Sequence, residues 1–547
     1  MGIESQSLRY LQPRHQRIQN ENQGIGGFVL PERAFTRHAQ NTEYQVRETA
    51  VLSKQLVHEF RFSYRRDYAR TDPAVDGYEI DVLGAFNAGS AQNRNVNDNR
   101  AVEFGDLWMY SGSRWSFKTG GQIVRRLNHN TNYNNFSGTF TFASLAAYIA
   151  GQPETFTQNQ GNPFVDDTQI ELGTFLQSDW KAAKNLNLSL GARYETQTNI
   201  SVNNLDPRLG FAYQFSKNTV VRGGMGAFHQ RMVQFIVDQL LRFDGIHQEQ
   251  FYVLNPSYPD PFANCEVSST CEPPSIRVKS PVLKTPYNLI SDLSLEQSLP
   301  KGMGLTFSWD FSRGIHLYRS RNINAPFPDG SLIRPNPLEG YLLQVESSAS
   351  SRSHNFTFGL RQTWRNKWNL NAFGTYTLGW IYNDTDGPFA LPQNSYDTRG
   401  EWGRAPSDQR HRFVTGVSFR RFWNLTVNTN VQANSNIPFN IITGFDDNHD
   451  GTVNDRPPGI NRNTGIGPDY FNVNMSFQKV VNLKSESQQP SRNGGAGPNV
   501  AFIVNLWNAF NHPQYQNYSG VLTSSYFGRP NRANNPRNIE LAMRFNF

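Results

Sequence analysis

The last ten residues, Asn538–Phe547, place large apolar side chains and polar or small side chains in strict alternation. Successive side chains of a β-strand point to opposite faces, so this pattern predicts a strand with one apolar face and one polar face. Such a strand fits a soluble sheet as well as a membrane barrel, and the fold therefore depends on whether the rest of the chain repeats the pattern. The apolar positions are Ile539, Leu541, Met543, Phe545 and Phe547.

Alternating segments recur along the chain from about residue 43. In the segment 186–196, for example, Leu186, Leu188 and Leu190 share one face, and polar or small residues occupy the other. We count roughly 17 or 18 segments of ~9–14 residues, the length at which a tilted strand crosses a bilayer. Short polar turns alternate with polar loops of varied length, and nearly every long loop falls on one side of the predicted sheet. That segregation is typical of outer-membrane barrels.

The composition agrees with a barrel. Only 37% of the residues are hydrophobic, yet the chain holds 39 Phe, 22 Tyr and 10 Trp. A barrel meets lipid with alternate residues only and uses aromatic residues in its interfacial girdles. No run of ~18 apolar residues occurs, which excludes a transmembrane helix. The net charge of +7 is small for 547 residues, and basic residues lie singly, so no nucleic-acid partner is predicted.

We therefore predict an all-β fold, a large antiparallel transmembrane β-barrel with long extracellular loops and short periplasmic turns, in the lipid of the bacterial outer membrane. Residues 43–547 form the barrel, and residues 1–42 form an irregular N-terminal segment or a partial strand. The stretch Met232–Leu241, inside the longest loop, has helical spacing. We expect it to form a small helix packed on or into the barrel mouth, and a gating helix is the alternative.

The N-terminus lacks the basic region and apolar region of a signal peptide. Because a barrel protein has to cross the inner membrane first, we expect this chain to be the C-terminal portion of a longer protein.

The only two cysteines, Cys265 and Cys271, have the spacing C-x5-C in a loop-like stretch. A local disulfide formed in an oxidising compartment is the preferred interpretation, and two unpaired thiols are the alternative. Two ligands are too few for a structural zinc site.

The stretch Asp446–Asp455 resembles a calcium-binding loop in the spacing of its oxygen-bearing residues. Alternate oxygen ligands, followed by a glycine at the tight bend, suit a hard cation. Position 12 holds Pro457 where such loops have Glu, and Asp455 is the candidate substitute. The other interpretation is a solvated turn without an ion, and calcium is the only cofactor predicted. The candidate ligands are Asp446, Asn448, Asp450, Thr452 (through its backbone carbonyl), Asn454 and Asp455.

No group of residues has the spacing of a catalytic site. The histidines are scattered, and neither G-x-S-x-G nor H-E-x-x-H occurs. We predict a protein that is not an enzyme. Charged pairs such as Arg193 with Glu195, and Glu540 with Arg544, are expected to line the barrel interior.

Several segments resemble parts of the barrel of TonB-dependent receptors, specifically their Oar-like branch, and they follow one another in the same order as in that family. The resemblance covers most of the chain from about residue 43, and the order of the motifs is more specific than any one of them. The matching segments are Phe175–Trp180 with Leu186–Glu195, Asp206–Tyr213 with Val220–Gly226, Asn454–Pro457 with Arg462 and Asn463, and Phe527–Pro530 with Arg537–Phe547.

The resemblance implies a receptor that binds a scarce nutrient outside the cell and imports it with energy transmitted by TonB. The ligand would be an iron chelate, a glycan fragment or a peptide, bound by the extracellular loops. A complete receptor also has a signal peptide, a TonB box, a plug domain and about 22 strands. We expect TonB to act on this chain only through the missing plug. The terminal Phe547 resembles the membrane-insertion signal that the barrel-assembly machinery reads.

Two other functions fit the same pattern. A plugless porin-like or adhesive surface barrel would work without TonB, and as a porin it would conduct ions by itself. A soluble secreted β-protein that binds carbohydrate would stay in solution without detergent. The strand length, the one-sided loops and the terminal Phe547 argue against the soluble protein.

Overall fold

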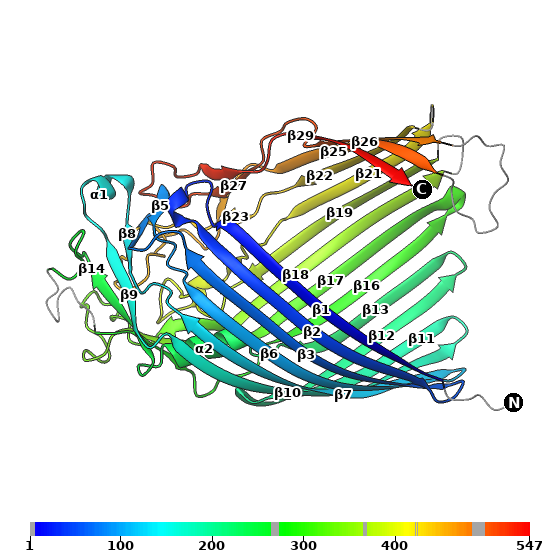
Figure 1. Cartoon of the computed structure of the whole chain (residues 1–547), viewed down its shortest axis with the longest axis horizontal. Coiled ribbons are helices and arrows are strands. Elements are labelled where there is room, and N and C mark those ends of the chain that lie inside the picture. The colour runs from blue at the N-terminus through cyan, green and yellow to red at the C-terminus, as the bar shows by residue number, and fades with distance from the viewer. Residues whose placement is uncertain are drawn as a thin grey trace.

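One large antiparallel sheet dominates the computed structural model, which describes residues 6–263, 273–364, 369–421, 423, 425–483 and 498–546. The sheet has 20 strands, of which eighteen pair in chain order and form a tilted, curved wall (Figure 1). The predicted fold class is therefore confirmed. The eighteen strands are β1 (Gln6–Gln23), β2 (Phe35–Val51), β3 (Leu56–Pro73), β6 (Asn95–Ser111), β7 (Trp115–Asn132), β10 (Phe164–Ala183), β11 (Leu186–Gln197), β12 (Ile200–Ser216), β13 (Thr219–His229), β16 (Tyr287–Leu299), β17 (Met303–Asn322), β18 (Leu342–Trp364), β19 (Leu370–Asn383), β21 (His411–Arg421), β22 (Leu425–Asn434), β25 (Tyr470–Asn482), β26 (Asn499–Trp507) and β29 (Asn538–Asn546).

The two faces of the sheet have the chemistry that the alternation predicts. On the apolar face, Phe62 and Phe104 meet across β3 and β6 with ring centroids 5.1 Å apart. On the polar face, the guanidinium of Arg61 contacts Glu103 at 2.5 Å. Because successive side chains alternate, lipid contacts one face only, and the polar face is the interior of the barrel.

The two ends of the wall differ (Figure 1). Short connections such as 112–114 and 184–185 lie at one end, which we call the turn end, and the long loops gather at the other, which we call the loop end. An aromatic pair marks the turn end, where Trp115 and Trp180 stack with centroids 5.0 Å apart. In outer-membrane barrels the long loops are extracellular and aromatic girdles lie at both interfaces.

Several strands extend farther toward the loop end than the alternation predicts. β18 begins at Leu342, whereas the apolar/polar pattern begins only near residue 355. Strand pairing continues there because Arg319–Asn322 of β17 pairs with Leu343–Glu346. These outer parts of the strands lie outside the apolar band that faces lipid, so apolar and polar residues do not have to alternate in them.

The sheet begins earlier than expected and is not closed by strand pairing. The segment 1–42 contributes all of β1 and the beginning of β2, so the expected boundary at residue 42 falls inside β2. Within the described residues, β1 pairs with β2 alone and β29 pairs with β26 alone. A side-chain contact nevertheless joins the β1–β2 connection to the β26–β29 connection at the loop end, where the Phe28 and Tyr526 rings lie 4.9 Å apart.

A second, smaller sheet forms at the loop end from segments expected to be irregular. Its strand order is β14-β9-β8-β4-β5. Phe140, Phe142 and Phe156 are fully buried in its core. The sequence pattern missed this sheet because most of its strands are only four residues long. The bounds are β4 (Glu79–Val82), β5 (Phe86–Gly89), β8 (Thr139–Phe142), β9 (Thr155–Gly161) and β14 (Gln248–Leu254), with α1 (Leu145–Ile149) beside them.

The remaining elements are short. None of the helices in the described part of the chain is long and apolar enough to cross a membrane. The short elements are β15 (Ile276–Lys279), parallel to β18, β20 (Gly403–Arg404), β23 (Pro438–Phe439), β24 (Gly465–Ile466), β27 (Tyr515–Tyr518), β28 (Pro530–Ala533), and the 3-10 turns Pro31–Arg33, Pro300–Gly302 and Arg399–Glu401.

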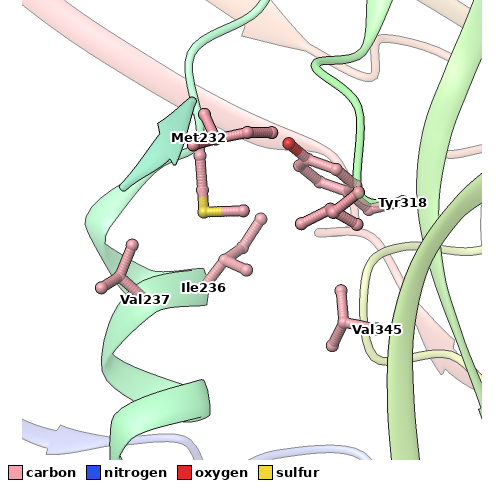
Figure 2. Close-up of a cluster of buried hydrophobic side chains, with 7 residues drawn as sticks. Met232, Ile236, Val237, Tyr318 and Val345 are labelled. Carbon is pink, nitrogen blue, oxygen red and sulfur yellow. The ribbon is translucent and has the colours of Figure 1, made fainter. Parts of the chain in front are cut away.

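The helix predicted over Met232–Leu241 is present as α2 (Gln234–Arg242). Its apolar side packs on strands from the other half of the wall. Ile236 of the helix and Met232, just before it, share a buried cluster with Tyr318 and Val345 (Figure 2). The packing role that the sequence suggests is therefore confirmed.

Candidate functional site

A recess of about 430 Å³ lies between α2 and strands β1, β2, β3, β6 and β7. Strand register brings its wall together, because Asn97 pairs with Asn130 and Asn99 pairs with Asn128. Each amide carries both a donor and an acceptor, so the wall suits a ligand rich in hydrogen-bonding groups. The polar side chains lining it include Asn41, Asp67, Asn97, Asn99, Asn128, Asn130, Gln234 and Asp238.

A smaller recess of about 200 Å³ adjoins the first and shares Asp67, Asn99 and Gln234 with it. Here Glu171 accepts from two arginines, Arg126 at 2.8 Å and Arg231 at 3.1 Å. Two guanidinium groups on one carboxylate leave a positive surplus, and guanidinium groups bind carboxylate and phosphate oxygens well. We call the two spaces together the mouth recess.

Buried polar contacts hold α2 over the mouth recess. Arg242, only 1% exposed, pairs with Asp238 at 2.9 Å and donates to the Asn130 side chain at 2.7 Å. At the other end of the helix, Gln234 donates to Asp167 at 3.4 Å. Sequence reasoning missed the mouth recess because its wall residues become neighbours only through the register of separate strands. The available signal was the run of polar residues at alternate positions in 95–101 and 126–130.

The predicted calcium loop Asp446–Asp455 lies at the loop end and is largely buried. Asp446, Asp450 and Asp455 are 3%, 2% and 4% exposed. The Asp446 carboxylate accepts the backbone N–H groups of Asp450 and Gly451, each at 3.0 Å. Gly451 has φ +89°, a conformation that favours glycine, so the predicted tight bend is present.

The other candidate ligands surround this bend. Asp455 accepts the N–H of Asp447 at 2.7 Å, and the Asn448 side chain contacts Asp450 at 3.3 Å. Asn454 donates to the Leu391 carbonyl at 3.0 Å, which leaves its side-chain oxygen without a hydrogen bond. Thr452 follows the bend at the position where such loops use a backbone carbonyl. In the described part of the chain, no three His, Cys, Asp or Glu side chains already meet as a metal site.

Burial makes ionisation of these aspartates costly. Loss of water, together with the charges of Asp446 and Asp455, raises the pKa of Asp450 to about 8. Loss of water also raises the pKa of Asp455 to about 6 and raises the pKa of Asp446. Burial disfavours a charged carboxylate unless an opposite charge or hydrogen bonds compensate it.

Three other sequence predictions have simple outcomes. Cys265, Cys271 and Phe547 lie outside the described residues, so the disulfide and the insertion signal remain predictions. Arg193 and Glu195 form the expected interior ion pair.

Comparison with known proteins places the chain among outer-membrane barrels. The family model for the outer membrane beta barrel domain matches residues 4–204 and 198–459. The structure is similar to the outer membrane transporter YddB from Escherichia coli, with a TM-score of 0.64 and 10% identity over 98% of this chain and 66% of that one. No curated protein sequence matches the chain.

Two further solved structures have the same fold. The siderophore receptor PirA from Acinetobacter baumannii gives a TM-score of 0.57 at 10% identity, over 93% of this chain and 62% of that one. The FrpB iron transporter from Neisseria meningitidis (F3-3 variant) gives 0.56 at 10% identity, over 98% and 69%. The chain thus spans about two thirds of the length of these proteins, and such low identity relates the folds alone. With its family model covering most of the sequence and its eighteen-strand wall, this chain belongs to the outer membrane beta barrel domain family.

Proposed function

We propose that this chain forms the wall of a TonB-dependent transporter of the Oar-like branch, which takes up a small nutrient from outside the cell. The observation that carries the proposal is the mouth recess, which is built from the polar face of the wall and covered by α2 at the loop end. A passive pore has no need of a helix that a buried arginine, Arg242, holds over its mouth through a hydrogen bond to Asn130 of the wall. The similar transporters and receptors named above agree with this function.

The chemistry of the mouth recess favours a polar ligand that carries negative charge. Arg126 and Arg231 share Glu171. A carboxylate or phosphate of the ligand can therefore bind one guanidinium while Glu171 stays paired with the other. A neutral glycan would use the amides but would leave the surplus positive charge without a partner. Of the candidate ligands, an anionic metal chelate or an acidic peptide therefore fits better than a glycan.

Energy coupling would come from outside the wall itself. In this proposal a plug domain of the full protein contacts the TonB system, and the barrel-assembly machinery inserts the wall into the outer membrane. The chain described here contributes the ligand site at the loop end and the passage behind it.

Ferric citrate, an anionic chelate, is a suitable first probe. We expect the full protein to take up the labelled chelate only in cells with TonB, and Arg231→Gln to lower its binding severalfold. The matched control is Arg222→Gln, because Arg222 is as exposed as Arg231 but lies away from the mouth recess (both side chains 51%).

A different pattern would favour the alternative, a porin-like or adhesive barrel. Uptake that persists without TonB, combined with steady ion conductance in planar bilayers, would show that the ligand crosses by passive diffusion and not by TonB-dependent transport. Loss of binding in both arginine variants would show that the mouth recess is not the ligand site.

A further inference from the structure

We propose that the loop Asp446–Asp455 binds Ca²⁺ and that the ion fastens the loop-end segments to one another. This inference is independent of the transported ligand and of TonB.

The first argument is a group of buried carboxylates with no arginine or lysine bonded to them. Asp446, Asp450 and Asp455 are each at least 96% buried. Within the part of the chain that the structure describes, their hydrogen-bond partners are backbone N–H groups, an amide and a phenol rather than Arg or Lys. Three neighbouring buried carboxylates are expensive unless a cation neutralises them.

The second argument is an oxygen atom with no partner. The Oδ1 atom of Asp450 is inaccessible to solvent and accepts no hydrogen bond, although its residue is 2% exposed. The backbone N–H of the same residue donates to the Asp446 carboxylate at 3.0 Å, so two of the acidic residues are in direct contact. Asn454, four residues farther along, also has a buried side-chain oxygen without a partner. Buried acceptors are almost always satisfied, so these atoms point to a missing donor or cation.

The third argument is the order of donors along the loop. Asp446, Asn448 and Asp450 hold positions 1, 3 and 5, and Gly451 bends the chain at position 6. The ligand set would combine carboxylate oxygens with amide and backbone carbonyl oxygens, and in the described structure the three aspartate side chains do not converge on one point. Oxygen donors at irregular positions along a loop suit Ca²⁺ better than Zn²⁺, which prefers nitrogen and sulfur, or Mg²⁺, which demands octahedral geometry.

The loop's neighbours show what the ion would stabilise. Tyr252 of β14 donates to Asp446 at 3.3 Å, and Asn322 at the end of β17 donates to the Asp450 carbonyl at 3.0 Å. Tyr341, just before β18, donates to the His449 carbonyl at 3.2 Å. β14 and the two ends of the β17–β18 connection, which are far apart in the sequence, therefore meet on this loop, and an ion inside it would hold them together.

Terbium luminescence tests the site directly, because Tb³⁺ replaces Ca²⁺ and the nearby Tyr252 can sensitise its emission. The full chain, purified in detergent and stripped with EDTA, is titrated with TbCl3 and then with CaCl2. We expect saturable emission that CaCl2 displaces, and at least tenfold weaker binding in Asp450→Asn. The matched control is Asp447→Asn, because Asp447 has the same charge in the same loop but is exposed.

Equal emission from the wild type and Asp450→Asn would overturn the proposal, as would an equal loss in Asp447→Asn, which would mean adventitious binding to surface carboxylates. A protease assay guards against simple misfolding. In CaCl2 the wild-type loops should resist cleavage better than those of Asp450→Asn. In EDTA the order should reverse, because without the ion the wild type has to bury or protonate a carboxylate that the neutral Asn side chain replaces. An Asp450→Asn chain that is cleaved faster to the same degree in both buffers would assign Asp450 a purely structural role.

Discussion

The Arg242 guanidinium reaches from α2 to the side-chain oxygen of Asn130 on β7, at a distance of 2.7 Å. The same side chain is 1% exposed and holds Asp238, itself 4% exposed. One residue therefore fastens the helix to the inner wall and neutralises the only buried acid on that helix.

We expect Arg242→Gln to detach α2 from the wall, because it leaves Asp238 buried without its partner. Breaking a buried ion pair in this way costs about 3–5 kcal/mol of local stability. Hydrogen exchange followed by mass spectrometry should show faster exchange over 231–247, with no change in the membrane strands. Arg399→Gln is the control, because Arg399 pairs with Asp397 at 91% side-chain exposure and should have almost no effect. Unchanged exchange in Arg242→Gln would mean that the apolar cluster alone holds the helix.

The strands of the wall were predictable because lipid imposes one rule along their whole length. Each lipid-facing residue has to be apolar and each interior residue can be polar, as in Leu186–Gln197. Where strands leave the apolar band, as β18 does before residue 355, that rule no longer applies and the pattern disappears.

The loop end could be predicted only in part. The spacing of Asp446, Asn448 and Asp450 is local, so the bend at Gly451 was foreseeable. The contact with Tyr252, almost two hundred residues away, depends on how separate loops pack. The mouth recess was not foreseeable for the same reason, since no short stretch of sequence contains its wall.

Gly120 lies where β6 and β7 approach too closely for a side chain. An added Cβ would sit 2.3 Å from the backbone oxygen of Asp106, which cannot move without disturbing the strand pair. We expect Gly120→Ala to cost about 1–3 kcal/mol through overpacking and to lower the yield of folded, heat-modifiable barrel. Gly374→Ala is the matched control, because its Cβ would meet nothing closer than 3.7 Å. Equal yields from both variants would contradict the close approach.

The small sheet should respond to pH through Asp81. Burial, with a further contribution from Glu79, raises the pKa of Asp81 to about 6. The folded sheet then binds a proton more tightly than the unfolded chain, so its stability is greatest below the ordinary Asp pKa and falls as the pH rises toward 6. The free energy of unfolding of the small sheet is expected to fall by about 2–3 kcal/mol over this pH range.

Hydrogen exchange over β4 and β8, corrected for the intrinsic effect of pH, measures this loss between pH 4 and pH 7.5. Asp81→Asn should remove most of it, because the amide keeps a partner for Asn87, which contacts Asp81 at 2.7 Å, and does not titrate. A wild-type sheet that is as stable at pH 7.5 as at pH 4 would show that Asp81 ionises without cost.

Contacts between Phe28 and the segment 519–533 connect the beginning and end of the wall at the loop end. The Phe28 and Tyr526 rings lie 4.9 Å apart, and Ser524 donates to the Gly84 carbonyl at 2.5 Å. We expect Tyr526→Ala to weaken this connection by about 1 kcal/mol beyond the loss of buried area, with faster exchange over 24–34 and 519–533 together. Tyr515→Ala, which removes a more exposed ring outside the contact, should leave 24–34 unchanged. Faster exchange at only one of the two segments would mean that they are stabilised separately.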